Sequence, residues 1–225
     1  IIVNCLTPEM QAVREALPKA LAENSTTFSA DSVCPTINML NTKYFILPTQ
    51  QGGTMPLANP NAYGNAWFVG KVVYAATARE EMDMLKRIDR RNEAVVGKDF
   101  AAALGNATEL RRDSADAITL TAYEPNKLTY EVSSANGGVA VLSEVYYPGW
   151  TAELDGQEIQ IARADYVLRA VKVPAGKHTL VLTFDPASLK TTEAVAYVAM
   201  AVMLLALVCA AIISLRRRKT AKVKE

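Results

Sequence analysis

The feature that most constrains this chain is an uncharged apolar run near its C-terminus, at residues 194–215. Its 22 residues include no Asp, Glu, Lys, Arg, Gly or Pro. A helix of this length rises about 33 Å, enough to cross a hydrocarbon core of about 30 Å. The alternative is a buried core helix of a soluble protein, but such helices seldom run this far without a charge. We therefore expect a transmembrane helix within residues 190–215.

The charges around this run predict its orientation. Residues 216–225 carry six basic residues and one acidic residue, whereas the rest of the chain has 18 basic against 22 acidic residues. Because basic residues flanking a span tend to stay inside, we expect a basic cytoplasmic tail at 216–225. The bulk of the chain, before residue 190, is then extracytoplasmic, and the lipid bilayer is its first expected partner.

The first residues, IIVNCLTPEM, have no initiator Met, basic n-region or apolar signal segment. We therefore expect a C-terminal piece of a longer membrane protein whose upstream transmembrane helices carry this part across. A tail-anchored protein with its soluble part in the cytoplasm is the alternative, but it breaks the charge rule. Cys209 lies in the span, and whether Cys5 and Cys34 pair is left open by their spacing.

Residues 1–112 are expected to form a small α+β region. Thr77 and Glu80 have the spacing of a capping box, in which each side chain bonds a backbone N–H of the other residue. The remaining elements are an amphipathic helical stretch at 1–24 broken by Pro18, a short helical turn or loop at 31–40, strands at 43–47, 66–75 and 93–96, a loop at 51–63, and a brief helix at 99–104 ending at Gly105.

Residues 113–189 are expected to form an all-β antiparallel sandwich of the jelly-roll or Ig-like kind. Short strands alternate there with turn signals, of which Asp155-Gly156 is the sharpest because a type I′ hairpin turn needs positive φ at both positions. The strands are expected at 117–123, 127–133, 139–146, 150–154, 157–162, 166–173 and 178–184.

The stretch YYPGW at 146–150 has two interpretations. Trp150, Ala152 and Leu154 alternate with Thr151 and Glu153, so Trp150 is expected to point with the core face. An exposed aromatic platform for a sugar is the alternative. Tyr146 and Tyr147 lie on opposite faces, so one of the two can join the core.

Motifs for catalysis or cofactor binding are missing from this sequence. His178 is the single histidine, with no neighbouring metal ligand, and the glycines do not have phosphate-binding spacing. We therefore predict no catalytic residue, no metal site, no cofactor and no nucleic-acid binding for this chain.

Five stretches together resemble the C-terminal region of the YfhO family of polytopic bacterial membrane proteins. They are NMLNTKYFI (38–46), NAYGNAWFV (61–69), AYEPNKLTYEV (122–132), YYPGWTAELDG (146–156) and PAGKHTLVLTFDP (174–186), followed by a last membrane helix and a basic tail. The resemblance implies a GT-C-type glycosyltransferase of the bacterial cytoplasmic (inner) membrane. Such enzymes move a sugar from a polyprenyl-phosphate carrier to cell-envelope polymers such as teichoic acids, and their catalytic loop lies upstream of the region matched here.

Two functions follow from this reading. The first is a non-catalytic extracytoplasmic module of a polyprenyl-sugar-dependent glycosyltransferase, which contacts envelope glycan or the polyprenyl-linked sugar. The second is a membrane-anchored module that binds glycan or protein and has no enzyme attached. Candidate glycan contacts are Tyr147, Arg163 and Tyr166.

Overall fold

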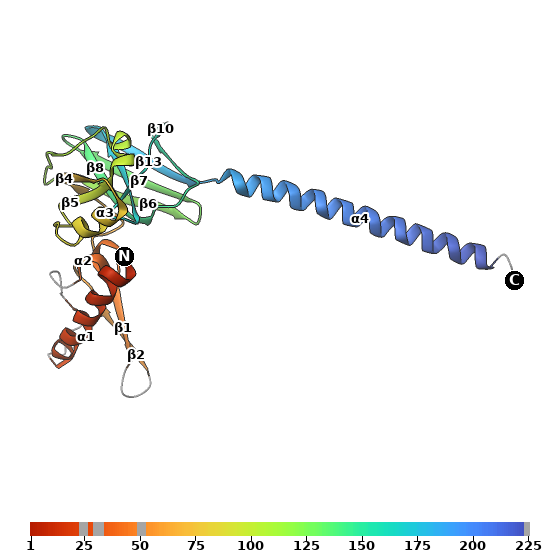
Figure 1. Ribbon diagram of the computed structural model, residues 1–225, viewed down its shortest axis with the longest axis horizontal. Coiled ribbons are helices and arrows are strands. Elements are labelled where there is room, and N and C mark those ends of the chain that lie inside the picture. Colours follow the sequence, from red (N-terminus) through yellow and green to blue (C-terminus); the bar gives the residue numbers. More distant parts are fainter. Residues whose placement is uncertain (23–26, 29–33, 49–52, 223–225) are drawn as a thin grey trace. The chain divides into compact units, whose positions relative to one another are not determined.

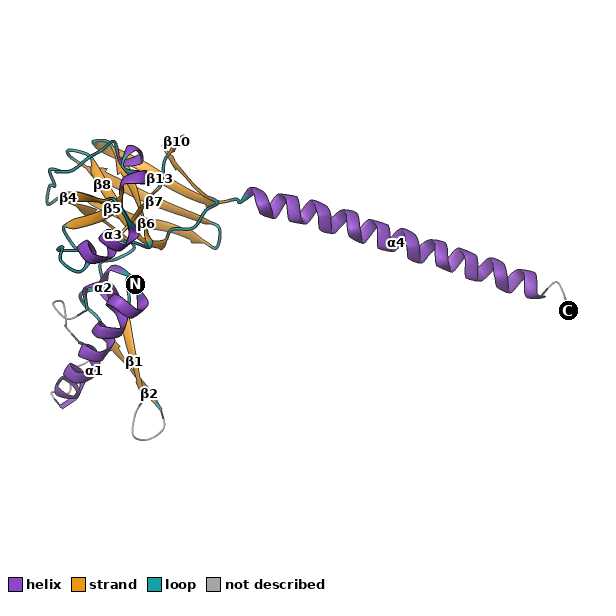
Figure 2. Cartoon of the chain, viewed as in Figure 1, coloured by secondary structure: helices purple, strands orange, loops and turns teal. Residues whose placement is uncertain are grey.

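The computed structural model describes residues 1–22, 27–28, 34–48 and 53–222 (Figure 1). The chain divides into two compact units, Ile1–Phe184 and Asp185–Glu225. The first is rich in strands and the second is one long helix (Figure 2). The expected fold class is therefore confirmed: a mixed helix and strand region, a β-sandwich and a C-terminal apolar helix.

One layer of the sandwich is a five-stranded antiparallel sheet in the order β10-β9-β13-β7-β6. Along β7 the buried residues Leu128, Tyr130 and Val132 alternate with more exposed neighbours, as expected for a strand with one face in the core. Its strands are β6 (Ala117–Glu124), β7 (Lys127–Ser134), β9 (Trp150–Leu154), β10 (Gln157–Ile159) and β13 (Gly176–Phe184).

The second layer is a six-stranded sheet in the order β3-β8-β12-β11-β5-β4. In β8 the run from Val139 to Leu142 is buried on both faces, since Ala140 and Leu142 face the five-stranded sheet while Val139 and Val141 join a second core on the other side. Its strands are β3 (Ala66–Val69), β4 (Lys71–Ala75), β5 (Glu93–Gly97), β8 (Gly138–Val145), β11 (Ala162–Ala164) and β12 (Leu168–Val173).

Strands from both sides of residue 112 share this second sheet, because β3, β4 and β5 join β8, β11 and β12. The division of the chain into regions 1–112 and 113–189 stays a prediction about the order of elements along the sequence. The expected strands from residue 117 onward match the observed ones, although the run 157–162 is split between β10 and β11.

The parallel pair β4 and β5 is joined by helix α3 (Ala78–Leu85). Thr77 caps α3, since its side-chain oxygen accepts the Glu80 N–H at 3.2 Å. The return bond differs from the prediction, because Glu80 accepts the N–H of Ala76 at 2.7 Å, one residue earlier than Thr77. Met82 and Leu85 of α3 are buried against the sheet. The expected brief helix is a pair of 3₁₀ turns, Lys98–Phe100 and Ala102–Leu104, ending at Gly105 with φ 61.

The N-terminal elements form a third small core around Val13, Phe45 and Leu57. They are a π-turn at Ile2–Leu6, α1 (Thr7–Ala22), α2 (Pro35–Met39), and a hairpin of β1 (Tyr44–Pro48) and β2 (Thr54–Ala58). Two expectations were wrong here. Helix α1 continues through Pro18, and residues 54–58 are a strand instead of loop because Leu57 is buried opposite Phe45. Residues 23–24, 31–33 and 51–52 of the expected elements lie outside the described part.

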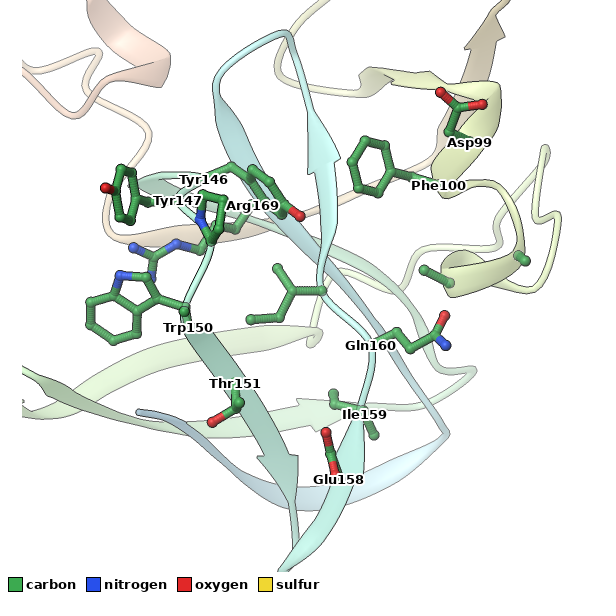
Figure 3. Close-up of a pocket in the computed structure, with 15 residues that line it drawn as sticks. Asp99, Phe100, Tyr146, Tyr147, Trp150, Thr151, Glu158, Ile159, Gln160 and Arg169 are labelled. Atoms are coloured by element: carbon green, nitrogen blue, oxygen red, sulfur yellow. The ribbon is translucent and has the colours of Figure 1, made fainter. Parts of the chain in front are cut away.

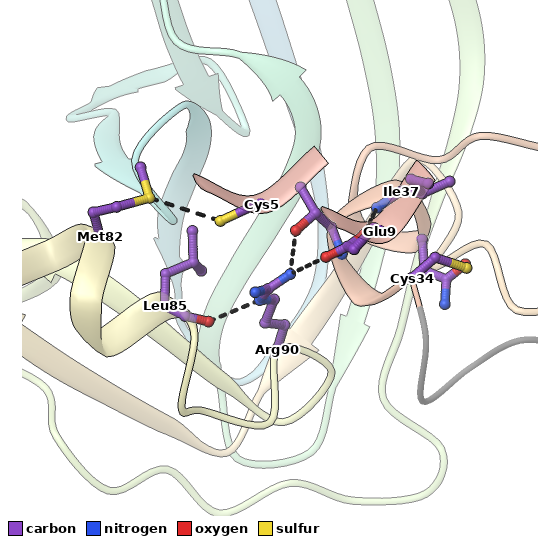
Figure 4. A network of polar contacts seen from close by, with 9 residues as sticks. Cys5, Glu9, Cys34, Ile37, Met82, Leu85 and Arg90 are labelled. Carbon is purple, nitrogen blue, oxygen red and sulfur yellow. Dashed lines mark hydrogen bonds and ion pairs between the residues drawn. The ribbon is translucent and has the colours of Figure 1, made fainter. Parts of the chain in front are cut away.

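A buried ion pair ties the N-terminal elements to the sandwich (Figure 4). Arg90 donates from Nη1 to Glu9 Oε1 at 3.0 Å, and from Nε to the Leu85 carbonyl at 2.8 Å. Glu9 also accepts the N–H groups of Thr36 and Ile37, each at 3.0 Å, at the start of α2. Cys5 and Cys34 are both buried, and no disulfide joins them.

Helix α4 (Ala187–Lys222) contains a 23-residue apolar stretch, Thr191–Ile213, with a mean hydropathy of 2.7. None of this stretch is buried within the described structure, which contradicts the alternative of a soluble core helix. By length and composition α4 can cross a membrane. Its apolar stretch begins at Thr191, three residues before the uncharged run at 194–215 on which the prediction was based.

Candidate functional site

A cleft of about 730 Å³ opens at one end of the sandwich (Figure 3). Four segments form it: the 3₁₀ turns after β5, the connection from β8 into the start of β9, the end of β10 with its connection to β11, and Arg169 of β12. The lining residues are Asp99, Phe100, Ala102, Ala103, Tyr146, Tyr147, Pro148, Gly149, Trp150, Thr151, Glu158, Ile159, Gln160, Ile161 and Arg169.

Trp150 and Arg169 form one wall of the cleft. The guanidinium carbon of Arg169 lies 4.0 Å from the centroid of the Trp150 ring, a close cation–π contact. Two more aromatic rings extend this wall. The ring centroid of Phe184 lies 5.3 Å from that of Trp150 and 6.1 Å from that of Tyr147. Trp150 is half-buried and also packs against the core between the sheets, whereas Tyr147 is exposed.

Arg169 is an unusual residue for this position because only 3% of it is exposed. Its Nε donates to the Val145 carbonyl at 3.0 Å, while Nη1 has no hydrogen-bond partner within the described residues. Burial lowers the pKa of Arg169, and the nearby Glu144 carboxylate opposes this shift. A guanidinium keeps its proton under such conditions, so Arg169 places a fixed positive charge behind the Trp150 ring.

Phe100 and Tyr146 form the opposite wall. Their rings meet edge to face, with centroids 5.5 Å apart and planes at 72°. The backbone of Tyr146 is fixed by its N–H, which donates to the Val167 carbonyl at 2.7 Å. In Figure 3 the labelled polar side chains Asp99, Glu158 and Gln160 lie around the same opening.

This combination of groups determines what the cleft can bind. Flat aromatic faces pack against the apolar C–H faces of a ring-shaped ligand, while carboxylate and amide oxygens accept hydrogen bonds from its hydroxyl groups. A concave site that combines aromatic surface with oriented polar groups is typical of small-ligand sites. Sugars present C–H faces and hydroxyl edges together, so a carbohydrate matches the lining.

Residues 106–196 match the family model described as bacterial membrane protein YfhO. Over these residues the chain is similar to the YfhO family, in agreement with the resemblance of its sequence motifs. The matched segment, called the YfhO region below, begins before β6 and ends inside α4, so it includes Tyr147, Trp150 and Arg169. A search of curated proteins found no match to this chain.

The three predicted glycan contacts all lie in the YfhO region, but only one of them lines the cleft. Tyr147 lines the cleft. Arg163 and Tyr166 lie beside it and contact each other, with the Arg163 guanidinium carbon 5.7 Å from the Tyr166 ring centroid. Sequence reasoning missed Arg169 and Phe100. The one available signal for Arg169 was a charged residue within the apolar run of β12, which an alternating strand places on a buried face.

His178 lies in a second hollow of the YfhO region, of about 590 Å³. Its Nδ1 is 2.6 Å from Asp155 Oδ2, and its Nε2 is 3.2 Å from the Ala175 carbonyl. A carboxylate and a carbonyl oxygen both accept, so the two contacts form together as hydrogen bonds when the imidazole is protonated. The bond to Asp155 raises the pKa of His178. In its protonated state His178 therefore joins the turn at Asp155 to the turn at Ala175.

Proposed function

We propose that this chain is the extracytoplasmic, glycan-binding part of a polyprenyl-phosphate-sugar-dependent membrane glycosyltransferase that acts on cell-envelope polymers. The observation that carries the proposal is the cleft, in which Trp150, Tyr146 and Phe100 present aromatic surface beside Asp99, Glu158 and Gln160. Similarity to a bacterial membrane protein family and the apolar helix α4 support attachment to the cytoplasmic membrane.

In this proposal the cleft holds an acceptor glycan and performs no bond-making step. Trp150 stacks on one sugar ring through the face that Arg169 does not cover. Because the guanidinium draws the π electrons of the indole toward itself, it does not strengthen the contact with C–H groups on that open face, so shape and hydroxyl bonding provide most of the selectivity. Asp99 and Glu158 accept hydroxyl protons. The transfer itself belongs to membrane-embedded residues upstream, as the YfhO resemblance implies.

The proposed orientation places the cleft outside the cytoplasm. Six basic residues follow α4, and basic residues next to a span resist translocation. An envelope polymer and the cleft are then on the same side of the membrane.

A second candidate is a membrane-anchored glycan-binding module with no enzyme attached. It is supported by the cleft together with α4, an apolar helix long enough to anchor such a module in a membrane. The coding sequence upstream separates the two: several hydrophobic segments with an acidic early loop favour the enzyme, and one signal peptide favours the module.

A binding panel tests glycan binding directly. The 225-residue chain in detergent is applied to immobilised envelope glycans, including teichoic acids and peptidoglycan strands, and compared with Trp150→Ala and with Tyr123→Ala. Tyr123 is a matched control, since it is an aromatic residue 66% exposed on β6 and outside the cleft. We expect binding by the wild-type chain and Tyr123→Ala, and a loss of about tenfold or more for Trp150→Ala.

The same experiment includes a folding control. Trp150→Ala removes a half-buried ring and should lower the free energy of unfolding by about 1–3 kcal/mol, less than the about 3–5 kcal/mol of a fully buried aromatic residue. Denaturant unfolding of each variant measures this. Glycan binding that Trp150→Ala retains, or no binding by the wild-type chain to any glycan, would contradict the proposal.

A further inference from the structure

The turn between β11 and β12 has an unusual backbone for its sequence. Asp165 and Tyr166 both have left-handed φ values, 50 and 71. Glycine or Asn is the usual residue in this region, and a bulky aromatic residue there is an outlier. A turn that joins two strands could use Asn and Gly at these positions without strain. Tyr166 therefore occupies a backbone conformation that favours glycine, which has no side chain.

Neighbouring groups hold this backbone in place. The fully buried Asp165 accepts the Val95 N–H at Oδ1 at 2.9 Å, and its own N–H donates to the Val95 carbonyl at 2.7 Å. Glu81 of α3, which is 1% exposed, accepts the Tyr166 N–H at 2.8 Å. Strained residues that the surrounding structure fixes in this way are concentrated at functional sites.

The turn brings Tyr166 against Arg163. Glu81 Oε2 accepts a hydrogen bond from Arg163 Nη2 at 2.9 Å, so one carboxylate orients both residues. The Arg163 side chain is 32% exposed and Tyr166 is half-buried, so both can be reached from solvent. A planar guanidinium beside an aromatic ring forms a flat, hydrogen-bonding surface.

This surface continues into the cleft through Phe100. The guanidinium carbon of Arg163 lies 5.7 Å from the Phe100 ring centroid, and Phe100 in turn contacts Tyr146 on the cleft wall. A continuous row of contacts thus runs from Tyr146 through Phe100 and Arg163 to Tyr166, and it begins in the cleft that Trp150 also lines. Such a row is longer than one sugar needs.

We propose that Arg163 and Tyr166 form a second sugar subsite next to the cleft, so that the ligand is an oligosaccharide chain and not a single sugar. The proposal rests on the proposed glycan binding and specifies its ligand as the polymeric partner. Tyr166 stacks on a ring of the chain, and Arg163 donates to its hydroxyl oxygens from the N–H groups that Glu81 leaves accessible.

Tyr166→Gly separates this role from a structural one. A glycine relieves the left-handed strain at this position but loses the packing of the Tyr166 ring against the neighbouring core, and because the two effects oppose each other the melting temperature should change little. Affinity should fall about 2- to 10-fold for oligosaccharides, because one aromatic contact is lost, and should stay unchanged for the monosaccharide. Arg163→Lys, which keeps the charge and loses the planar fork, should give the same length-dependent loss.

The measurement is titration calorimetry with the full chain in detergent. The probes run from the monosaccharide to the hexasaccharide of the glycan that binds in the panel, and Tyr123→Ala serves as the control. A wild-type affinity that does not rise with chain length, or an equal loss for all lengths in Tyr166→Gly, would overturn the second subsite while leaving the cleft intact. If no glycan binds the wild-type chain, both proposals fall together.

Discussion

At the residue scale, the Trp150 side chain contacts both the core and the cleft. Its ring packs against the core between the sheets and also lines the cleft over Arg169. Alternation along β9 predicted the inward direction of this side chain, but alternation cannot show that a strand's first residue lies at the open end of the sandwich. Core packing fixes the ring, and the open end makes it available to a ligand.

His178 and Asp155 lead to a prediction about pH. The hydrogen bond to Asp155 raises the pKa of His178 above 6.5. The pKa of Asp155 is lowered below 3.8, mainly by the hydrogen bond from the Thr179 N–H and next by the one from His178. The raised His178 pKa stabilises the fold at low pH, and this contribution is lost as pH rises through the folded-state pKa. The lowered Asp155 pKa stabilises at higher pH, and its contribution is lost as pH falls through the folded-state value. The pair is therefore fully effective between about pH 4 and 6.5.

NMR titration of the single imidazole is the direct measurement. We expect a His178 pKa above 6.5 in the wild-type chain and a lower value in Asp155→Asn. Asn is a suitable control residue because it also tolerates the left-handed φ of 53 at this turn position. An unchanged His178 pKa in Asp155→Asn would show that the contact does not form in solution.

At the scale of elements, two turn glycines share the same backbone strain but differ in the space around them. Gly137 and Gly156 both have positive φ, 71 and 80. A Cβ at Gly137 would lie 2.7 Å from the Val173 carbonyl oxygen and 2.9 Å from the Ala175 nitrogen, whereas a Cβ at Gly156 would meet nothing within 4 Å. Gly156→Ala should cost about 1 kcal/mol from strain alone, and Gly137→Ala clearly more.

Denaturant unfolding of the two alanine variants tests this difference. Equal losses of unfolding free energy would mean that the turn from β7 to β8 can move away from the Pro174–Gly176 turn. A larger loss for Gly137→Ala would establish that the two turns are held against each other.

Elements with a regular pattern were predictable from sequence, and those that depend on distant partners were not. The alternating strands after residue 116 and the Asp155-Gly156 turn were found in the expected places, since two-residue periodicity and turn chemistry are local. Strand β2 was missed because Pro56 and the preceding glycines favour a loop, while its pairing with β1 depends on burial of Leu57. The cleft was missed because residues near 100, 150 and 160 meet only in the folded sandwich.

At the scale of the whole molecule, the chain combines a strand-rich unit with an apolar helix followed by a basic tail. We predict that residues before α4 face outward and that the tail is cytoplasmic, because moving six basic residues across the membrane is unfavourable. In the protein expressed from its complete gene, a fluorescent reporter that matures only in the cytoplasm should be active when fused after Glu225.

A fusion of the same reporter after Phe184, which removes α4, serves as the control and should be dark. A bright fusion after Phe184 together with a dark fusion after Glu225 would favour the tail-anchored alternative, in which the soluble part lies in the cytoplasm and the tail lies outside. A dark reporter after Glu225 together with an active exported-enzyme fusion at that site would contradict the proposed orientation.

The claim that the cleft binds glycan can be tested at a single side chain. Trp67 and Trp150 are the two tryptophans, and Trp67 is buried while Trp150 lines the cleft. In a Trp67→Phe chain, the fluorescence of Trp150 can be titrated with the panel's best glycan and then quenched with iodide. We expect a saturable change in emission and protection of Trp150 from iodide at saturating glycan. Glycan binding that leaves both the emission and the iodide quenching of Trp150 unchanged would place the ligand elsewhere and contradict the cleft as its site.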